Sequence, residues 1–334
     1  MAKIVTLGEI MLRLSTTVGT RVTRAHSFMA HYGGGEANVA ISLANYGHQV
    51  SFASKVPANH LGTAAIEHLK RSSVDTQFML AGGDRLGTYY LEMGSGARAS
   101  QVIYDRKGSS FAEMTELEWE IDQLLKDVTI FHISGITPAL SDNWRSMTLE
   151  LIKAAKKAGC MISLDINYRQ KLWGANGCTA FLKEVLPLVD ICSAGKLDAQ
   201  YLLAIPAFTG SGNEIIYYNE QIQQLYPNIK VLYSTIRTVY SASHNDLVGT
   251  FWSNGKYVES RVHQMDPIVD RIGGGDAFAG GILHGILTNQ EPQQIVEFAT
   301  AASALEHTVF GDENQFSESE IIAYMNSNSG EVLR

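Results

Sequence analysis

The sequence predicts an α/β fold with a mostly parallel central sheet and helices on both of its faces. Short apolar runs typical of buried strands alternate with longer runs of helical periodicity for most of the 334 residues. This order is typical of βαβ units, which place helices on both faces of a parallel sheet. Ligands of such sheets bind beyond the carboxyl ends of the strands, so functional residues are expected where strands end.

The predicted elements follow one another in a regular order. Strands are expected at residues 3–8, 50–55, 129–134, 161–166, 188–194 and 230–235. Helices are expected at residues 36–46, 61–71, 144–158, 179–186, 214–225, 275–287 and 292–308. No internal repeat or proline-rich linker interrupts this series, which indicates one domain over residues 1–334.

One section departs from the alternation and predicts a β-hairpin. Residues 87–93 and 100–104 alternate in polarity on either side of the turn-prone Gly94-Ser95-Gly96. With part of residues 11–28, the hairpin is expected to form a small sheet that projects as a lid, so that the lid comprises about residues 11–28 and 86–106. The exposed edges of such a sheet are able to pair across a homo-oligomer.

Composition excludes several classes of protein. With 26 basic and 34 acidic residues the net charge is −8, which argues against a nucleic-acid binder, so any anionic ligand must be held by local positive groups. The three cysteines are odd in number and indicate buried thiols. The N-terminus is too polar for a signal peptide, and no apolar stretch approaches the length of a membrane span. A cytoplasmic protein without a membrane partner is expected.

A glycine run before the helix at residues 275–287 is the strongest functional signal. Gly273, Gly274 and Gly275 lead into Asp276. Glycines allow backbone N–H groups to turn inward, and a helix N-terminus presents unpaired donors with partial positive charge. The run therefore predicts an anion cradle with Asp276 as a candidate base. Taken alone, it is equally compatible with a tight turn capped by Asp276.

A second glycine run, Gly33-Gly34-Gly35-Glu36-Ala37-Asn38, also leads into a helix. Its backbone would allow close approach of a polyol, and Asn38 offers a donor and an acceptor to hydroxyl groups. A plain turn before a helix is an equally good interpretation of this run alone. Two such helix starts in one α/β chain favour a shared binding site.

Two arginines are candidate anion ligands. Arg106 follows Tyr104-Asp105 at the end of the predicted hairpin, opposite Tyr89 and Tyr90. It would bind a carboxylate bidentately, or form a salt bridge with Asp105 or a neighbouring acid. Arg169 ends the run Asp165-Ile166-Asn167-Tyr168-Arg169, directly after a strand. It is either an anion ligand or a capping or ion-pair arginine.

Several familiar motifs are absent from the sequence. It contains no P-loop, no Gly-x-Ser-x-Gly elbow and no metal spacing among its histidines. The dinucleotide fingerprint also fails, because Phe278 stands where its third glycine is required. Serine hydrolysis, metallohydrolysis and hydride transfer therefore lack their usual residues.

The chain resembles the ribokinase-like (PfkB) carbohydrate kinases. The likeness rests on Gly33-Gly34-Gly35-Glu36-Ala37-Asn38 and Asp270-Arg271-Ile272-Gly273-Gly274-Gly275-Asp276-Ala277-Phe278, in this order with a lid between them. It implies a three-layer α/β/α ribokinase-like fold and an ATP-dependent sugar kinase using Mg²⁺, with Asp276 as base and the three glycines as anion hole. A role for a monovalent cation stays open.

A closer likeness is to the 2-keto-3-deoxygluconate kinases. It rests on Gly8-Glu9-Ile10-Met11-Leu12-Arg13-Leu14, on Tyr104-Asp105-Arg106, and on residues 165–169 with Leu172-Trp173. It implies that the acid sugar is bound by Tyr90, Tyr104, Arg106 and Arg169 and its hydroxyls by Gly34, Gly35 and Asn38. It also implies that the nucleotide lies along Asn167, Thr235, Arg237, Gly273 and Gly275.

Two segments depart from the family pattern. Thr235-Ile236-Arg237-Thr238-Val239-Tyr240 lacks the glycines of the usual Thr-x-Gly-x-x-Gly. Gly195-Lys196-Leu197-Asp198 stands in place of the magnesium-linked Asn-x-x-Glu. The details of phosphate contact and the protein ligands of magnesium are therefore left unassigned.

The resemblance implies phosphoryl transfer from MgATP to the C6 hydroxyl of 2-keto-3-deoxygluconate. Fructose or another sugar is the alternative substrate, and a non-catalytic sugar-acid sensor or a dinucleotide oxidoreductase is the alternative of another class. Asp276 is expected to be a weak base, because a helix N-terminus favours its charged form.

Overall fold

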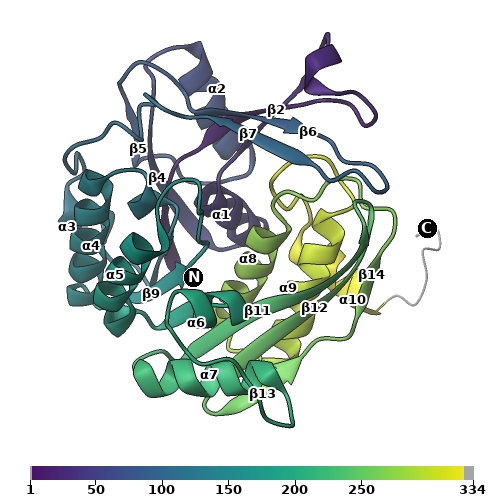
Figure 1. Cartoon of the computed structure of the whole chain (residues 1–334). Coiled ribbons are helices and arrows are strands. Elements are labelled where there is room, and N and C mark those ends of the chain that lie inside the picture. Colours follow the sequence, from purple (N-terminus) through teal and green to yellow (C-terminus); the bar gives the residue numbers. More distant parts are fainter. Residues whose placement is uncertain (1, 327–334) are drawn as a thin grey trace.

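Two β-sheets organise the chain, a large one in the middle and a small one along one edge (Figure 1). This computed structural model describes residues 2–326. Residues 1 and 327–334 of the single domain predicted over residues 1–334 lie outside the described part. Within residues 2–326, every helix is too short or too polar to cross a membrane.

The large sheet is parallel over most of its width. Its strand order is β13-β12-β11-β10-β9-β8-β1-β4-β5, with β14 also paired to β12. Only β12 joins its neighbours β11, β13 and β14 in antiparallel pairs. The strands are β1 (Lys3–Leu7), β4 (Gln49–Val56), β5 (Met79–Ala81), β8 (Ile130–Ser134), β9 (Met161–Asp165), β10 (Ile191–Ser193), β11 (Val231–Ser241), β12 (His244–Ser253), β13 (Lys256–Glu259) and β14 (His263–Met265).

Helices cover both faces of this sheet (Figure 1). On one face lie α4 (Asp142–Lys157), α5 (Ala175–Val185) and α7 (Glu214–Leu225), and on the other α1 (Gly35–Asn45), α2 (His60–Arg71), α8 (Gly274–Leu287) and α9 (Pro292–Glu306). The remaining helices are α3 (Ile121–Leu124), α6 (Lys196–Tyr201), α10 (Glu318–Asn326) and the 3₁₀ turns η1 (Val22–Arg24), η2 (Thr137–Ala139) and η3 (Leu186–Leu188). The predicted three-layer α/β/α fold is confirmed.

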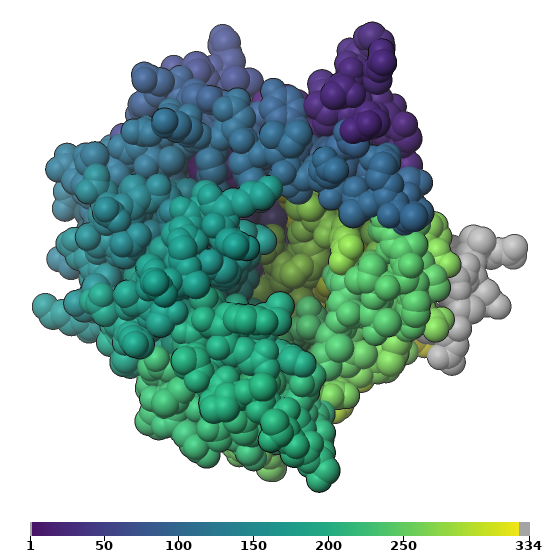
Figure 2. All heavy atoms as spheres, in the orientation of Figure 1, coloured from purple at the N-terminus to yellow at the C-terminus, as the bar shows by residue number. Residues whose placement is uncertain are grey.

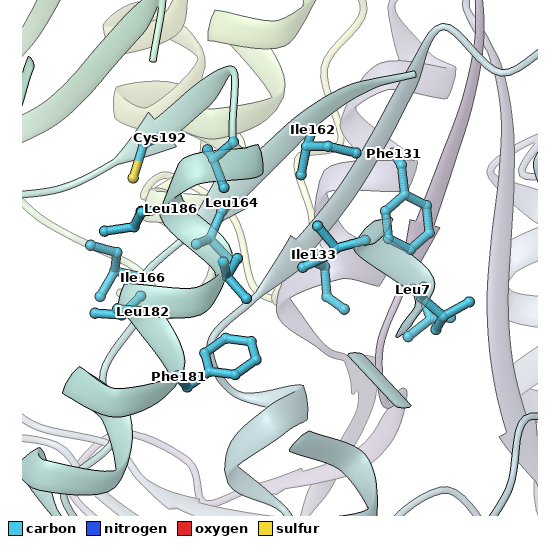
Figure 3. Packing of buried hydrophobic residues seen from close by; sticks show 14 of the residues in the cluster. Leu7, Phe131, Ile133, Ile162, Leu164, Ile166, Phe181, Leu182, Leu186 and Cys192 are labelled. Carbon is cyan, nitrogen blue, oxygen red and sulfur yellow. The ribbon is translucent and has the colours of Figure 1, made fainter. Parts of the chain in front are cut away.

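The core follows from the alternation of side chains along each strand. Val5 and Phe131 pack toward α4 and α5, whereas the preceding Ile4 and Ile130 pack toward α1 and α8. Figure 3 shows the first of these layers, with Phe131 and other strand residues facing Phe181 of α5. Because both faces are covered, the central strands are mainly apolar, and each fully buried apolar side chain contributes about 1.5–3 kcal/mol.

Helix α8 is held tightly between α1 and α9. A Cβ atom on Gly280 would lie 2.5 Å from Cβ of Ser42 on α1, and one on Gly281 would lie 2.5 Å from Cα of Ala299 on α9. Glycine thus permits backbone approach on two sides of α8. The start of this helix, where Asp276 lies, is fixed by that packing.

The sheet extends further than the sequence predicted. The strand expected at residues 230–235 continues to Ser241, because β12 pairs antiparallel along its whole length. Strands β12, β13 and β14 were not predicted. The continuation of β11 is largely exposed, with Ile236 39% and Val239 54% exposed, so it lacks the apolar run of a buried strand.

The small sheet, called the lid sheet below, has the strand order β3-β2-β6-β7. Its strands are β2 (Met11–Ser15), β3 (Met29–Gly33), β6 (Thr88–Glu92) and β7 (Gln101–Asp105). Strands β6 and β7 form the expected hairpin, and β2 lies parallel to β6. Strand β3 begins one residue after the expected limit at residue 28, so the first lid segment extends to Gly33.

Candidate active site

A cavity of about 990 Å³ lies between the lid sheet and the carboxyl ends of the large sheet. Figure 2 shows a hollow at this place, below the blue strands of the lid sheet. Segments that follow β1, β3, β8 and β9 supply much of its wall. Its lining includes Glu9, Gly34, Gly35, Asn38, Tyr89, Tyr104, Arg106, Lys107, Asn167, Arg169, Lys171, Ile272, Asp276 and Asp312.

The two predicted glycine runs meet in this cavity. Asp276 lies in the first turn of α8, and Nδ2 of Asn38 in α1 donates a hydrogen bond of 2.7 Å to its Oδ2. A Cβ atom on Gly35 would lie 3.5 Å from Oδ1 of Asp276. The start of α1 thus approaches the start of α8, which places the expected polyol site next to the expected base.

The pKa of Asp276 is raised to about 7, mainly by burial. The hydrogen bond from Asn38 opposes this rise, the nearby acids Asp165 and Glu36 add to it, and Arg169 lowers it again. We expected the helix N-terminus to keep Asp276 a weak base, and this expectation is corrected. Removal from water outweighs the helix dipole, and a carboxylate titrating near neutral pH is well matched to proton transfer.

Each of the three glycines meets different surroundings. Gly273 has φ 92°, and a Cβ atom there would overlap the carbonyl oxygen of Asp312. A Cβ atom on Gly274 would overlap the ring of His307, whereas one on Gly275 would meet no atom within 4 Å. The N–H groups at the start of α8 have no carbonyl partner within the helix. The turn can therefore hold an anion beside Gly275, where space is open.

Arg169 provides a positive charge in the same cavity. Its side chain is exposed, and it forms no ion pair or side-chain hydrogen bond within residues 2–326. Lys107 and Lys171, which the sequence analysis did not select, line the cavity as well. These three cations suit a carboxylate ligand.

Arg106 lines the cavity but is already paired with an acid. Its Nε donates to Oε2 of Glu9 over 2.8 Å, and its Nη2 forms a buried ion pair with the same oxygen. Asp105, the partner considered from the sequence, is instead bound by Arg85. Of the two interpretations left open by the sequence, the structure shows the salt bridge, with Glu9 in place of Asp105, so the charge of Arg106 is compensated.

Tyr89, rather than Tyr90, lines the cavity from the lid sheet. Adjacent residues of a strand point to opposite faces, and Tyr90 packs edge-on against Phe28 at 5.7 Å between ring centres. Tyr89 donates a hydrogen bond to Asp312. Tyr104, as expected, lies at the cavity.

The residues expected along the nucleotide are divided between two places. Asn167 lines the cavity with a left-handed φ of 38°, and its Nδ2 donates to Oδ2 of Asp165 over 3.3 Å. Thr235 and Arg237 lie on β11, outside the cavity lining. Arg237 remains connected to the glycine turn, because its Nη2 lies 3.0 Å from Nε2 of His307, the neighbour of Gly274.

No protein ligand set for magnesium is evident. Within residues 2–326, no group of three or more His, Cys, Asp and Glu side chains could hold a metal ion. Mg²⁺ usually reaches phosphoryl-transfer sites bound to substrate phosphates and water, with one or two carboxylates. A metal that arrives with the nucleotide is compatible with this site.

Residues whose roles depend on distant contacts could not be identified from the sequence. Neither Glu9, the partner of Arg106, nor Asp312, the acceptor of Tyr89, has a local signal of its role. Adjacent residues of a strand point to opposite faces, so the sequence cannot tell whether Tyr89 or Tyr90 faces the cavity until one neighbouring residue has been assigned to a face. For Lys107 and Lys171 a signal existed, since each lies within two residues of a selected arginine.

The chain matches known proteins over nearly its whole length. Residues 1–318 match the model of the pfkB family carbohydrate kinase. A 2-dehydro-3-deoxygalactonokinase of Haloferax volcanii is 31% identical over 312 residues, which are 93% of this chain and 92% of the relative.

Two solved structures superimpose closely. A PfkB family carbohydrate kinase of Listeria grayi has a TM-score of 0.94 and 45% identity, covering 97% of this chain and 100% of that one. A 2-dehydro-3-deoxygluconokinase of Thermotoga maritima has a TM-score of 0.94 and 36% identity, covering 98% and 100%.

Proposed function

Because the chain belongs to the pfkB family of carbohydrate kinases, we propose that it transfers phosphate from MgATP to the C6 hydroxyl of 2-keto-3-deoxygluconate. This compound is also named 2-dehydro-3-deoxygluconate. The main support is that one cavity holds Asp276, with a pKa of about 7, together with Arg169, an exposed cation. A sugar acid needs such a pair, since its hydroxyl must meet a base and its carboxylate a cation.

In the proposed reaction, Asp276 would accept the proton of the C6 hydroxyl as its oxygen attacks the γ-phosphorus, while the bond from this phosphorus to the β,γ-bridging oxygen breaks and ADP leaves. The N–H groups around Gly273–Gly275 hold the transferred phosphoryl group. The transition state is loose, so positioning and electrostatics dominate over base strength. Each oxyanion donor contributes about 3 kcal/mol.

At the sugar, Gly34, Gly35 and Asn38 are proposed to contact hydroxyl groups. Arg169, assisted by Tyr104 and Arg106, is proposed to hold the carboxylate. Because Arg106 is paired with Glu9, we propose that it orients Glu9 in the cavity wall as well as contacting the carboxylate of the sugar. Closure of the lid sheet over the sugar would exclude water from the phosphoryl group.

At the nucleotide, Asn167, Thr235 and Arg237 are proposed contacts beside the glycine turn. The buried Nη1 of Arg237 has no hydrogen-bond partner among residues 2–326. Burial lowers the pKa of Arg237 to about 10, aided by Arg271. A charged donor kept beside the turn at this cost is consistent with a phosphate contact.

A screen of ATP consumption tests the proposal. The substrates are 2-keto-3-deoxygluconate, its C4 epimer 2-keto-3-deoxygalactonate, fructose, ribose and gluconate, each with K⁺ or Na⁺. We expect the highest kcat/KM with a 2-keto-3-deoxy sugar acid. A preference for fructose would contradict the proposal in favour of a fructokinase, and sugar-acid binding without ADP release would indicate a sensor.

Replacing Arg169 with alanine tests the carboxylate contact. We expect the KM for the acid sugar to rise roughly 10- to 100-fold, because a hydrogen bond to a charged group contributes about 1.5–3 kcal/mol. The KM for ATP should change far less. Arg71→Ala, which removes an exposed arginine outside the cavity lining, is the matched control. An equal rise of both constants would refute the carboxylate role.

Two further parts of the proposal concern assembly and location. Strands β3 and β7 leave open edges on the lid sheet, where two copies are able to pair, and Ile103 on β7 is 48% exposed. Molar mass in solution tests this pairing, and a monomer would exclude it.

Cys160, Cys178 and Cys192 are buried free thiols, which suits a reducing compartment such as the cytoplasm.

A further inference from the structure

A buried arginine joins the lid sheet to the glycine turn. Arg13 lies on β2, and its side chain is 0% exposed. Its Nη2 forms an ion pair with Asp270, and its Nη1 forms one with Asp312. Nη1 also donates to the carbonyl of Gly311 over 3.1 Å, and Nε donates to Oγ of Ser15 over 2.7 Å. One guanidinium thus holds two loops of the main domain against the lid sheet.

Both acidic residues that pair with Arg13 also contact the turn before α8. Oδ1 of Asp270 accepts the N–H groups of Arg271 over 2.7 Å and Ile272 over 3.2 Å, which fixes the chain that enters the turn. The carbonyl of Asp312 occupies the space next to Gly273 that a side chain would need. Asp270 thus contacts the entry to the turn through its carboxylate, and Asp312 contacts Gly273 through its backbone carbonyl.

On the lid side, Arg13 belongs to a row that reaches the cavity. The strand register aligns His31 with Arg13, Arg13 with Tyr89, and Tyr89 with Tyr104. Side chains directly opposite in a sheet share one face. Tyr89 and Tyr104 line the cavity, and Tyr89 also donates to Asp312. The face that meets the sugar thus continues to the ion pairs behind the turn.

We propose that Arg13 is a positioning residue for phosphoryl transfer, which couples the seating of the lid sheet to the geometry of the Gly273–Gly275 turn. This inference rests on the proposed function of that turn. Burying three charges carries a large desolvation cost, and apolar residues of similar volume often give equal or greater stability. We therefore infer that these ion pairs serve to fix the relative positions of the groups. The planar guanidinium holds two carboxylates at once, which a lysine cannot do.

The variant Arg13→Lys tests the inference, since it keeps the charge and removes the fork. We expect kcat to fall about 100-fold, as displacements of about 1 Å at a reacting centre cause losses of that size. The KM values for sugar and ATP should stay within about 3-fold, because the contacts of Arg13 are with protein groups. Arg98→Lys is the matched control. Arg98 lies between β6 and β7 and pairs with Glu92 of β6, and neither residue lines the cavity. The kcat of this control should stay within about 2-fold.

Chemical rescue separates positioning from a general structural role. In Arg13→Ala, millimolar guanidinium should restore part of kcat, because the ion can enter the space between Asp270 and Asp312. The same ion should not restore Asp276→Asn. If Arg13→Lys does not fold, Asp312→Asn replaces it, since it keeps the side-chain size and the carbonyl beside Gly273, and a similar loss of kcat is expected.

A folded Arg13→Lys with kcat within 2-fold of the wild type, or Arg13→Ala without any guanidinium effect, would overturn the inference. The proposed function would still stand if Asp276→Asn is inactive in the same assay. If Asp276→Asn is fully active, the proposed function itself fails. The two failures therefore give different results.

Discussion

Asp276→Asn is expected to lower kcat by about 10²- to 10⁴-fold, the usual contribution of a general base. The asparagine cannot accept the hydroxyl proton. Its side-chain oxygen can still accept the hydrogen bond from Asn38, so the fold should persist. Coupled ADP release measures the loss, and circular dichroism checks the fold. Near-normal turnover in a folded variant would exclude Asp276 as the base.

The pKa of about 7 for Asp276 also predicts that the wild type and Asp276→Asn differ in their dependence on pH. Wild-type kcat/KM should fall as the pH drops below about 7, because the base becomes protonated. For stability, the folded-state pKa lies above the usual value of 3.8, so the wild type loses stability as the pH rises from about 4 to about 7. Asp276→Asn lacks this loss. Its Tm relative to the wild type should therefore be higher at pH 8 than at pH 5, and an equal difference at both would contradict the raised pKa.

Gly275→Ala should abolish most activity while leaving a stable protein. The new methyl group meets no protein atom within 4 Å, and alanine is favoured over glycine in a helix by about 1 kcal/mol. The Tm should therefore be unchanged or slightly raised. We expect kcat/KM to fall about 100-fold, because the methyl group would occupy the space of the transferred phosphoryl group and misplace it.

Gly273→Ala is the contrasting variant at the same turn. Its positive φ and its contact with the Asp312 carbonyl make any side chain unfavourable, with about 1–3 kcal/mol from backbone strain alone. Thermal unfolding should therefore show a clear loss of stability. For the first of these two variants, Gly275→Ala, full activity would mean that no phosphoryl group binds at this turn.

The sequence was sufficient for the layers of the fold and for the centre of the site. Apolar strands and periodic helices gave the central sheet, because both of its faces are covered. The two glycine runs identified Asp276 and Asn38, since helix starts have strong local signals. The second half of β11 escaped prediction because it is largely exposed and is held as a strand by its antiparallel pairing with β12.

Pairing between distant residues could not be predicted. The partner of Arg106 is Glu9, 97 positions away, and Arg13 pairs with Asp270 across 257 positions. The pKa of Asp276 depends on burial and on acids from other segments, and the helix dipole alone gave the wrong direction. Such properties arise from the assembled fold and leave no local pattern.

A crystal structure with 2-keto-3-deoxygluconate and a non-hydrolysable ATP analogue tests the central claim most directly. We predict the C6 oxygen within hydrogen-bond reach of the Asp276 carboxylate, the γ-phosphate against the Gly273–Gly275 turn, and the sugar carboxylate at Arg169. A sugar bound with its carboxylate toward Asp276, or a γ-phosphate remote from the turn, would contradict it.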